Sequence, residues 1–306
     1  MKFKQPVVTG YLHHQYALSL AEWGDPVSLS SSGGWLLSRC IPKTGFRDLM
    51  GCYPVFCCED FTRLHEDIVP LSRTHVSLAL VADSSGEYDE ALLRATFDRV
   101  RAFKSHFFAE LDRPWEQIAS KHHRYYARKS LAKVVVEPIL NLPGFLDIWC
   151  ALYQNLVRRH ALCGIKAFSR RSFAVQLSIP GLIGLRAVHR GQTVGAHLWM
   201  THNRVVHSHL AAFSDKGYEL MAAYALYAGA IQYFTGKVRW LNFGAGAGLG
   251  EERTDGLTQF KRGWATTTRT AWFCAKVLQP EHYSALSALK CKIDNDYFPA
   301  YRHGEF

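Results

Sequence analysis

The chain has 306 residues, of which 48% are hydrophobic and 20% are charged, so it is long enough for one large or two modest hydrophobic cores. This composition excludes intrinsic disorder, and the ordinary counts of 23 Gly and 11 Pro exclude collagen and low-complexity proteins. The most apolar stretch, residues 220–234, is shorter than the ~20 residues of a bilayer span. Since the N-terminus also lacks a signal-peptide pattern, we expect a cytoplasmic protein without a membrane span.

The eight cysteines contain no Cys-x-x-Cys pair and predict neither a zinc ribbon nor a disulfide framework. We expect them to be small buried hydrophobic residues. The chain is therefore expected to hold no metal and no resident cofactor.

The net charge of +10 is unevenly distributed. Residues 1–115 carry 12 Lys+Arg and 14 Asp+Glu, a net charge of −2, whereas residues 116–306 carry 24 and 12, a net charge of +12. Such a field attracts a polyanion, although it can also be a solvated face that keeps a protein soluble. On a helix, Lys121, Arg124 and Arg128 share one face, so they and Lys129 are candidates for contacts with successive phosphates of such a polyanion.

The first 115 residues predict a mixed α/β region. Short apolar runs at 34–39 and 51–56 and a helix at 60–69 precede a clear strand at 75–82. Apolar residues then recur at helical spacing and predict a helix from Asp89 to Leu111. Pro114 is placed to open a further helix that continues to about residue 133.

The second half predicts a mixed sheet. A short strand at 134–136 and a helix at 145–160 precede three antiparallel strands at 184–188, 193–200 and 204–211, which tight turns join. A buried helix at 218–235 then leads to a strand at 238–243, which must lie parallel to its predecessor. Such a sheet can open where the last two strands part, and the free strand-edge amides there can bond an extended ligand.

Three histidines, His197, His207 and His209, fall in the predicted sheet, with His207 and His209 on one face of a strand. They are candidates for a base or for hydrogen bonds in the cleft, and no third residue at ligand spacing supports a metal site. His122 and His123 sit in a polar helix and are expected on the surface.

The glycine-rich stretch 244–250 follows a strand but contains neither Gly-x-Gly-x-x-Gly nor Gly-Lys-Ser/Thr, so it does not predict a phosphate loop. It is either a loop that lets a substrate approach the backbone closely or a plain connector. We list Gly244 and Gly246, with Asn242, His207 and Trp264, as candidate substrate-binding residues.

The segment from Asp255 to Trp264, DGL-x-x-FKRGW, is the most specific motif. Together with the preceding LNFGAGAG and the KHHRYYARKS helix, it resembles GNAT-fold acyltransferases of the Fem type, over about residues 115–273. The resemblance implies an α/β (α+β) GNAT fold, with a mixed, mostly antiparallel sheet flanked by helices. It also implies two lobes, a degenerate N-terminal one at 1–114 and an acyltransferase lobe at 115–306.

For the site, the resemblance implies that Phe260 and Lys261 lie at the cleft and that Lys261 meets the negative charge that develops on the donor carbonyl. A fixed ammonium is worth ~3 kcal/mol in that position. The acceptor amine must be neutral to attack, and His209 or Asp215 is a candidate to take its proton.

The usual CoA pyrophosphate loop is replaced here by Ser214-Asp215-Lys216-Gly217-Tyr218-Glu219-Leu220, which lacks the second glycine and has two acids where a phosphate would lie. This disfavours CoA and, with the basic second half, favours an aminoacyl-tRNA co-substrate, whose phosphates would bind Lys121, Arg124, Arg128 and Lys129. We therefore expect an aminoacyltransferase that forms an amide on a cell-wall precursor, small peptide or natural product. The alternatives are an acyl-CoA-dependent N-acyltransferase and a catalytically silent RNA-binding protein of the same fold.

Overall fold

The computed structural model describes residues 8–202, 205–247, 255–290 and 297–305. Contacts divide the chain into two compact units: unit 1 takes residues 1–10 and 104–269, and unit 2 takes residues 11–103 and 270–306. The chain changes unit within two long strands, β5 (Arg99–Glu110) and β11 (Thr267–Val277). Compact units need not coincide with the lobes of a family, so the lobes 1–114 and 115–306 stay a prediction.

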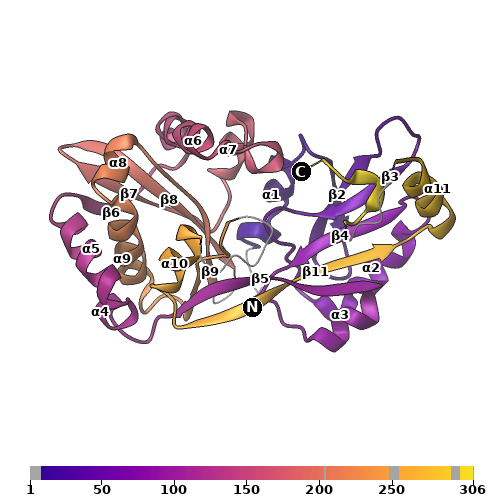
Figure 1. Ribbon diagram of the computed structural model, residues 1–306, viewed down its shortest axis with the longest axis horizontal. Helices are drawn as coiled ribbons and strands as arrows, with labels where there is room; N and C mark the ends of the chain where they lie inside the picture. Colours follow the sequence, from indigo (N-terminus) through magenta and orange to yellow (C-terminus); the bar gives the residue numbers. More distant parts are fainter. Residues whose placement is uncertain (1–7, 203–204, 248–254, 291–296, 306) are drawn as a thin grey trace, which may run out of the picture. The chain divides into compact units, whose positions relative to one another are not determined.

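Unit 1 contains all the candidate site residues, and its sheet has the strand order β5-β10-β9-β8-β7-β6 (Figure 1). The strands after β5 are β6 (Val135–Pro138), β7 (Leu182–His189), β8 (Gln192–His202), β9 (Val205–Phe213) and β10 (Trp240–Asn242). The pairs β6–β7, β7–β8, β8–β9 and β10–β5 are antiparallel, and β10–β9 is parallel. The predicted mixed, mostly antiparallel sheet is confirmed.

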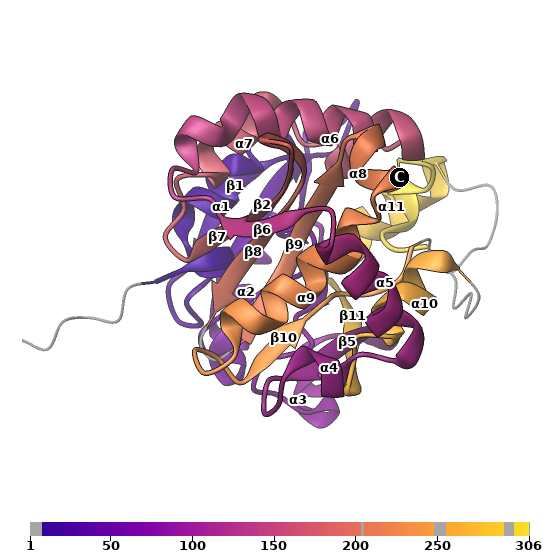
Figure 2. The same cartoon turned by 90° about the vertical axis from the view of Figure 1, so that its left-hand side faces the viewer.

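Helices cover both faces of this sheet (Figure 2). One face carries α5 and α9, and the other carries α6 and α7. The helices of unit 1 are α4 (Trp115–Ile118), α5 (Lys121–Leu131), α6 (Leu146–His160), α7 (Arg170–Gln176), α8 (Asp215–Glu219), α9 (Ala222–Phe234) and α10 (Gly256–Arg262), with 3-10 turns at Pro143–Phe145 and Gly164–Lys166. The apolar stretch predicted as a buried helix is α9, whose side chains form the centre of the core against the sheet.

Unit 2 has its own core around Leu36, Leu78 and Leu80. Its strand order is β1-β2-β3-β4-β11, from β1 (Asp25–Leu29), β2 (Gly34–Cys40), β3 (Arg47–Gly51) and β4 (Ser77–Ala82) to β11. Its helices are α1 (His14–Ser19), α2 (Leu64–Leu71), α3 (Glu90–Thr96) and α11 (Pro280–Lys290), with 3-10 turns at Gly10–Leu12, Phe61–Arg63 and Ala300–Arg302. The strand predicted at 75–82 is confirmed as β4.

The predicted helix from Asp89 to Leu111 is wrong beyond its first two turns. The helix α3 ends at Thr96, because Phe97 takes an extended conformation with φ −118° and ψ 148°. The residues that follow form β5, in which valine and phenylalanine side chains suit a pleated, half-buried surface. Aromatic residues four apart fit a helix face, but tertiary pairing with β10 decides in favour of the strand.

Two other predicted helices are each divided. The helix predicted after Pro114 breaks at Ala119, which is extended, and restarts where the Ser120 hydroxyl accepts a hydrogen bond from the His123 amide. The helix predicted at 218–235 breaks at Met221, which has φ +55°. None of the helices in the described part of the chain combines the length and the hydropathy that crossing a bilayer requires.

Candidate functional site

The predicted opening in the sheet lies between β9 and β10. Their parallel pairing runs only from Trp240 opposite Val205 to Asn242 opposite His207. Beyond His207, β9 continues to Phe213 along β8 alone, and the β8–β9 register shifts between Leu198 and Trp199. Strand edges that carry no ladder partner can bond an extended ligand.

The helix α10 holds Lys261 beside the loop that continues β10. The Asp255 carboxylate caps this helix by accepting from the Thr258 amide at 2.8 Å and from the Thr258 hydroxyl. From the last turn, the Lys261 Nζ donates to the Ala245 carbonyl oxygen at 2.6 Å. A Cβ added to Gly244 would lie 3.4 Å from the same Nζ, so the ammonium is close to the loop backbone.

The Lys261 ammonium is in an unusual electrostatic environment. Burial and the nearby charge of Lys104 lower the pKa of Lys261 to about 7, against a smaller opposite effect of Asp255. An ammonium has three N–H donors, and Ala245 takes one; among the residues with described positions, no other acceptor bonds this Nζ. The group is therefore equipped to bond an oxygen that gains negative charge.

Lys104, on β5, was not among the predicted site residues. Its Nζ lies 3.3 Å from the Gly246 carbonyl oxygen, one residue beyond the carbonyl that bonds Lys261. Burial and the charge of Lys166 lower the pKa of Lys104. Two lysines thus bond successive carbonyls of one glycine-containing loop, which gives the loop a positive environment.

Phe260 is half-buried, and its backbone connects α10 to α5. The His123 Nε2 lies 2.9 Å from the Phe260 carbonyl oxygen, and the His123 Nδ1 lies 2.8 Å from the Ser120 hydroxyl. The expectation of a surface His123 is wrong, because only 5% of it is exposed, whereas His122 is exposed as expected. Trp264 is wholly buried against the rings of Trp115, His123 and Tyr227, so it supports α10 from within the core.

His207 and Asn242 meet at the last paired position of β9 and β10. The Asn242 Nδ2 lies 3.3 Å from the Nδ1 atoms of both His207 and His106, and the Asn242 Oδ1 accepts from the Gly244 amide at 2.8 Å. All three side chains are buried. This network fixes the start of the loop that carries the carbonyls of Ala245 and Gly246. His106 was not predicted, because it lies on β5, within the segment expected to be helical.

The two candidate bases occupy different places. The His209 Nε2 lies 3.0 Å from the Gln176 Oε1 of α7, and burial lowers the pKa of His209 to about 3, so the imidazole is neutral. Asp215 is exposed at the start of α8, where the Asn155 Nδ2 donates to it at 3.1 Å. Within the described residues, Asp215 contacts neither His209 nor Lys261, so the structure does not bring the two candidates together. The third sheet histidine, His197, is wholly buried and lies 2.7 Å from the Ser208 hydroxyl.

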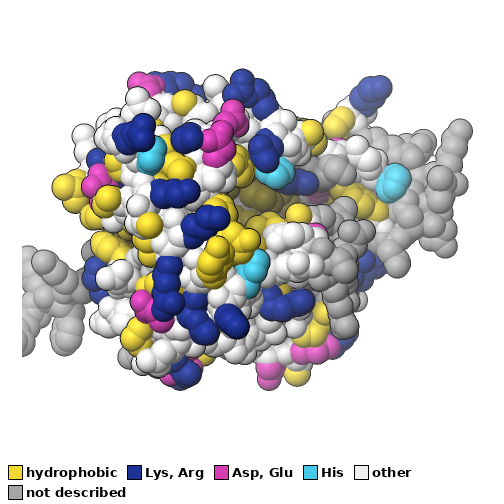
Figure 3. All heavy atoms as spheres, turned by 60° about the vertical axis from the view of Figure 1, so that its left-hand side comes forward, with side chains coloured by type: hydrophobic (Ala, Val, Ile, Leu, Met, Phe, Trp, Pro, Cys, Tyr) yellow, Lys and Arg dark blue, Asp and Glu magenta, His cyan; other side chains and the backbone are white. Residues whose placement is uncertain are grey.

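The four predicted tRNA-binding residues all lie on α5. Lys121, Arg128 and Lys129 are exposed, whereas the Arg124 guanidinium donates to the carbonyl oxygens of Glu116 and Ala119 at 3.1 and 3.0 Å. Arg124 therefore stabilises the break between α4 and α5. Figure 3 shows Lys and Arg side chains spread over the side of the molecule that unit 1 forms.

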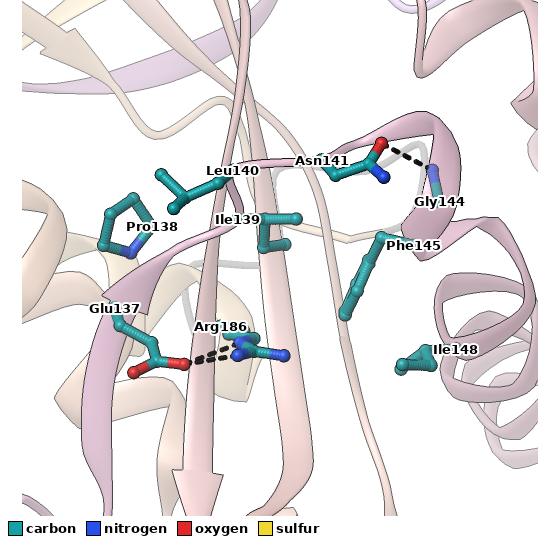
Figure 4. Close-up of a pocket in the computed structure, with 9 residues that line it drawn as sticks. All are labelled: Glu137, Pro138, Ile139, Leu140, Asn141, Gly144, Phe145, Ile148 and Arg186. Carbon is teal, nitrogen blue, oxygen red and sulfur yellow. Dashed lines mark hydrogen bonds and ion pairs between the residues drawn. The ribbon is translucent and has the colours of Figure 1, made fainter.

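A separate cavity of about 500 Å³ opens at the other edge of the unit 1 sheet, beside β6 (Figure 4). The Glu137–Arg186 ion pair lies at one side of it, and the 94%-exposed Leu140 lies on its rim. None of the predicted site residues lines this cavity. β7, β8 and β9 separate β6 from β10, so the cavity is not part of the Lys261 site.

No family model and no curated protein matches the sequence of the chain. Solved structures do match its fold. FemX aligns with a TM-score of 0.64 at 12% identity, over 89% of this chain and 92% of FemX. The C-terminal domain of a proposed lysylphosphatidylglycerol synthetase from Agrobacterium fabrum aligns with 0.61 at 13% identity, over 90% of each chain. L-PGS from Bacillus licheniformis aligns with 0.59 at 14% identity, over 89% of this chain and 94% of that chain.

The agreement with these structures extends over nearly the whole chain and not only over the segment that carries the FKRGW motif. At such low sequence identity, the agreement shows a shared fold, that is, a similar course of the backbone through the helices and the sheet. This chain therefore has the GNAT-type fold of the Fem proteins, as the sequence resemblance implied.

Proposed function

We propose that this protein is an acyltransferase that forms an amide, with an aminoacyl-tRNA as the donor and an amine of a cell-wall precursor or small peptide as the acceptor. The observation that carries the proposal is the Lys261 ammonium, which the Ala245 carbonyl holds beside the loop after β10 and which has no second bonded acceptor among the described residues. An oxyanion formed next to this group gains a charge-assisted hydrogen bond.

The reaction needs no covalent bond to the protein. The neutral amine attacks the carbonyl carbon of the ester, a C–N bond forms, and the π electrons move to the oxygen, where Lys261 bonds the resulting oxyanion. The intermediate collapses by breaking the C–O bond to the tRNA ribose. The proton lost by the nitrogen is matched by the one gained by the ribose hydroxyl. Asp215 is the remaining candidate carrier of that proton, because a pKa of about 3 makes the His209 imidazole a very weak base.

Two further observations support an aminoacyl ester over a CoA thioester. The helix α8 begins at Asp215, whose negative charge opposes a pyrophosphate at this helix end. The exposed cations of α5 belong to the same unit as Lys261, and α5 is bonded to α10 through His123. One of the solved structures with this fold is the C-terminal domain of a proposed lysylphosphatidylglycerol synthetase, a name in keeping with an aminoacyl donor.

The test supplies each donor separately. The purified protein is mixed with radiolabelled aminoacyl-tRNAs or with radiolabelled acetyl-CoA, in the presence of a short peptide with a lysine side chain, and label on the peptide is counted. We expect transfer from tRNA only, and a loss of about 10²- to 10³-fold in Lys261→Met. The matched control is Arg262→Met, which removes an exposed cation one residue away in the same helix.

Transfer from acetyl-CoA alone would overturn the tRNA donor and establish the N-acyltransferase alternative. Binding of tRNA by both wild type and Lys261→Met, without product from either donor, would instead support the catalytically silent RNA-binding alternative.

A further inference from the structure

A path of aromatic rings leads from the surface of α5 to the residue before Lys261. The centroids of His122 and Tyr126 are 4.6 Å apart, those of Tyr126 and Tyr224 are 5.3 Å apart, and those of Tyr224 and Phe260 are 4.9 Å apart. Tyr125 extends the path outward at 5.1 Å from Tyr126. Figure 2 shows α5 and α9, which supply these rings, side by side in unit 1.

The outer end of this path is exposed to solvent. Tyr125 is 60% exposed and His122 is exposed, while Tyr126 and Tyr224 are half-buried. A ring that serves only to fill a core gains most when it is fully buried. These rings instead keep part of their surface in water, although the buried Trp264 lies next to Tyr224.

Cations and rings alternate along the same helix. α5 has the sequence KHHRYYARKSL, with no acidic residue, and the Lys129 Nζ lies 6.0 Å from the centroid of the Tyr125 ring. Lys121, Arg128 and Lys129 are exposed beside the rings. Positive charge next to accessible aromatic faces matches a ligand that carries both phosphates and flat bases.

This combination distinguishes unpaired from paired nucleic acid. In a duplex the faces of the bases are covered by their neighbours, so only the phosphates are available to cations. In a single strand each base can stack on a ring, which contributes about 1–3 kcal/mol per base. The aminoacyl group of a charged tRNA is attached to such an unpaired 3′ end.

We propose that Tyr125, His122, Tyr126 and Tyr224 form a stacking platform for the unpaired 3′-terminal nucleotides of an RNA and thereby direct its terminal ribose toward Lys261. This inference rests on the proposed function for its donor, but the platform itself makes a claim about binding alone. The cations of α5 hold the backbone, and the rings select a strand whose bases are not paired.

The experiment measures binding by fluorescence anisotropy with two labelled probes, an unpaired RNA octanucleotide ending in CCA and a blunt RNA duplex with the same number of phosphates. We expect the wild type to prefer the unpaired probe. Tyr125→Leu should weaken its binding about tenfold, while Tyr125→Trp retains it. Because Tyr125 is exposed, neither change is expected to affect folding, which circular dichroism checks.

The matched control is Tyr233→Leu, which removes another tyrosine that has a lysine over its ring. Tyr233 lies at the far end of α9, and the Lys237 Nζ lies 3.4 Å from the centroid of its ring. The dependence of affinity on salt gives a second readout. A ring substitution should lower affinity without changing the slope of log K against log salt, because that slope counts phosphate contacts.

Equal affinity for the two probes, or equal loss in Tyr125→Leu and Tyr233→Leu, would overturn the platform. The proposed function is tested separately by the transfer of label. If Tyr125→Leu transfers label from tRNA as fast as the wild type, the platform is refuted but the proposed function is not. If the protein prefers the unpaired probe but transfers no label, the proposed function is refuted but the platform is not.

Discussion

The His123 Nε2 lies 2.9 Å from the Phe260 carbonyl oxygen, so one imidazole joins the basic helix α5 to the helix that carries Lys261. Burial lowers the pKa of His123, which keeps the ring neutral near pH 7. Because a carbonyl oxygen only accepts, Nε2 carries the proton, and Nδ1 accepts from the Ser120 hydroxyl.

His123→Leu should therefore lower both stability and activity. It removes two hydrogen bonds in a buried position and leaves the Phe260 carbonyl without its donor, at a cost of about 1–3 kcal/mol in the free energy of unfolding. Urea denaturation measures this cost, and the transfer assay measures the activity. In the control His189→Leu, an imidazole that bonds the Lys133 carbonyl at the other edge of the sheet is lost, and activity should not change. Equal activity in the two variants would contradict the positioning role of His123.

At a constant concentration of neutral acceptor amine, the rate of transfer should decline as the pH rises through about 7. The pKa of Lys261 is lowered to about 7, so the ammonium that bonds the oxyanion is present below this pH and is lost above it. Lys261→Arg keeps its charge at high pH, and it should remove the decline even if its maximum rate is lower. Lys104→Gln removes a charge that lowers the pKa of Lys261, so the decline should move to higher pH. An unchanged pH profile in Lys104→Gln would show that the two ammonium groups are not coupled.

Gly246→Ala should displace the cap of α10. A Cβ at this position would lie 1.9 Å from the Thr258 Oγ1 and 2.8 Å from the Asp255 Oδ2, so the two residues that begin the helix must move. We expect the activity to fall at least tenfold and the melting temperature to fall only a little. Gly256→Ala is the control, since no atom lies within 4 Å of its added Cβ, and alanine favours a helix. If both variants retain full activity, the position of α10 does not determine the rate.

Substitution of Arg128 should affect RNA binding, whereas substitution of Arg124 should affect stability. Arg128 is exposed, and Arg128→Gln should reduce the slope of log K against log salt by about one for tRNA. Arg124→Gln should leave that slope nearly unchanged and lower the melting temperature, because the bonds to the carbonyls of Glu116 and Ala119 are lost. Isothermal binding at several salt concentrations and thermal unfolding distinguish these results. A reduced slope in Arg124→Gln alone would reverse the assignment.

The sequence was sufficient for the part of the fold in which local signals agree. The three antiparallel strands from residue 182 onward are mostly apolar runs that turn residues join, and the parallel β10 follows from the helical crossover before it. The helix predicted at 89–111 failed because aromatic residues four apart suit either structure, and pairing with a strand 130 residues later decides between them. Local periodicity contains no information on that pairing.

From the sequence, candidate site residues could be predicted only where they belong to a recognisable motif. Lys261 and Phe260 belong to the FKRGW segment, whereas Lys104 is bonded to a carbonyl 142 residues away and has no local signature. The burial of His123 has no local signature either, because its sequence context is polar and its burial results from the packing of α10 on α5. Asp215 is exposed in the structure, and its role as a base stays a prediction.

The chain crosses from one unit to the other within β5 and within β11, and this limits where the protein can be truncated. A fragment that starts at residue 115 would lack the whole of β5, and β10 would then expose the edge that Phe108, Ala109 and Glu110 cover in the intact chain. An uncovered apolar strand edge invites association between copies. Recombinant truncations at this boundary should therefore aggregate, whereas a fragment that begins before Arg99 retains the strand that covers β10.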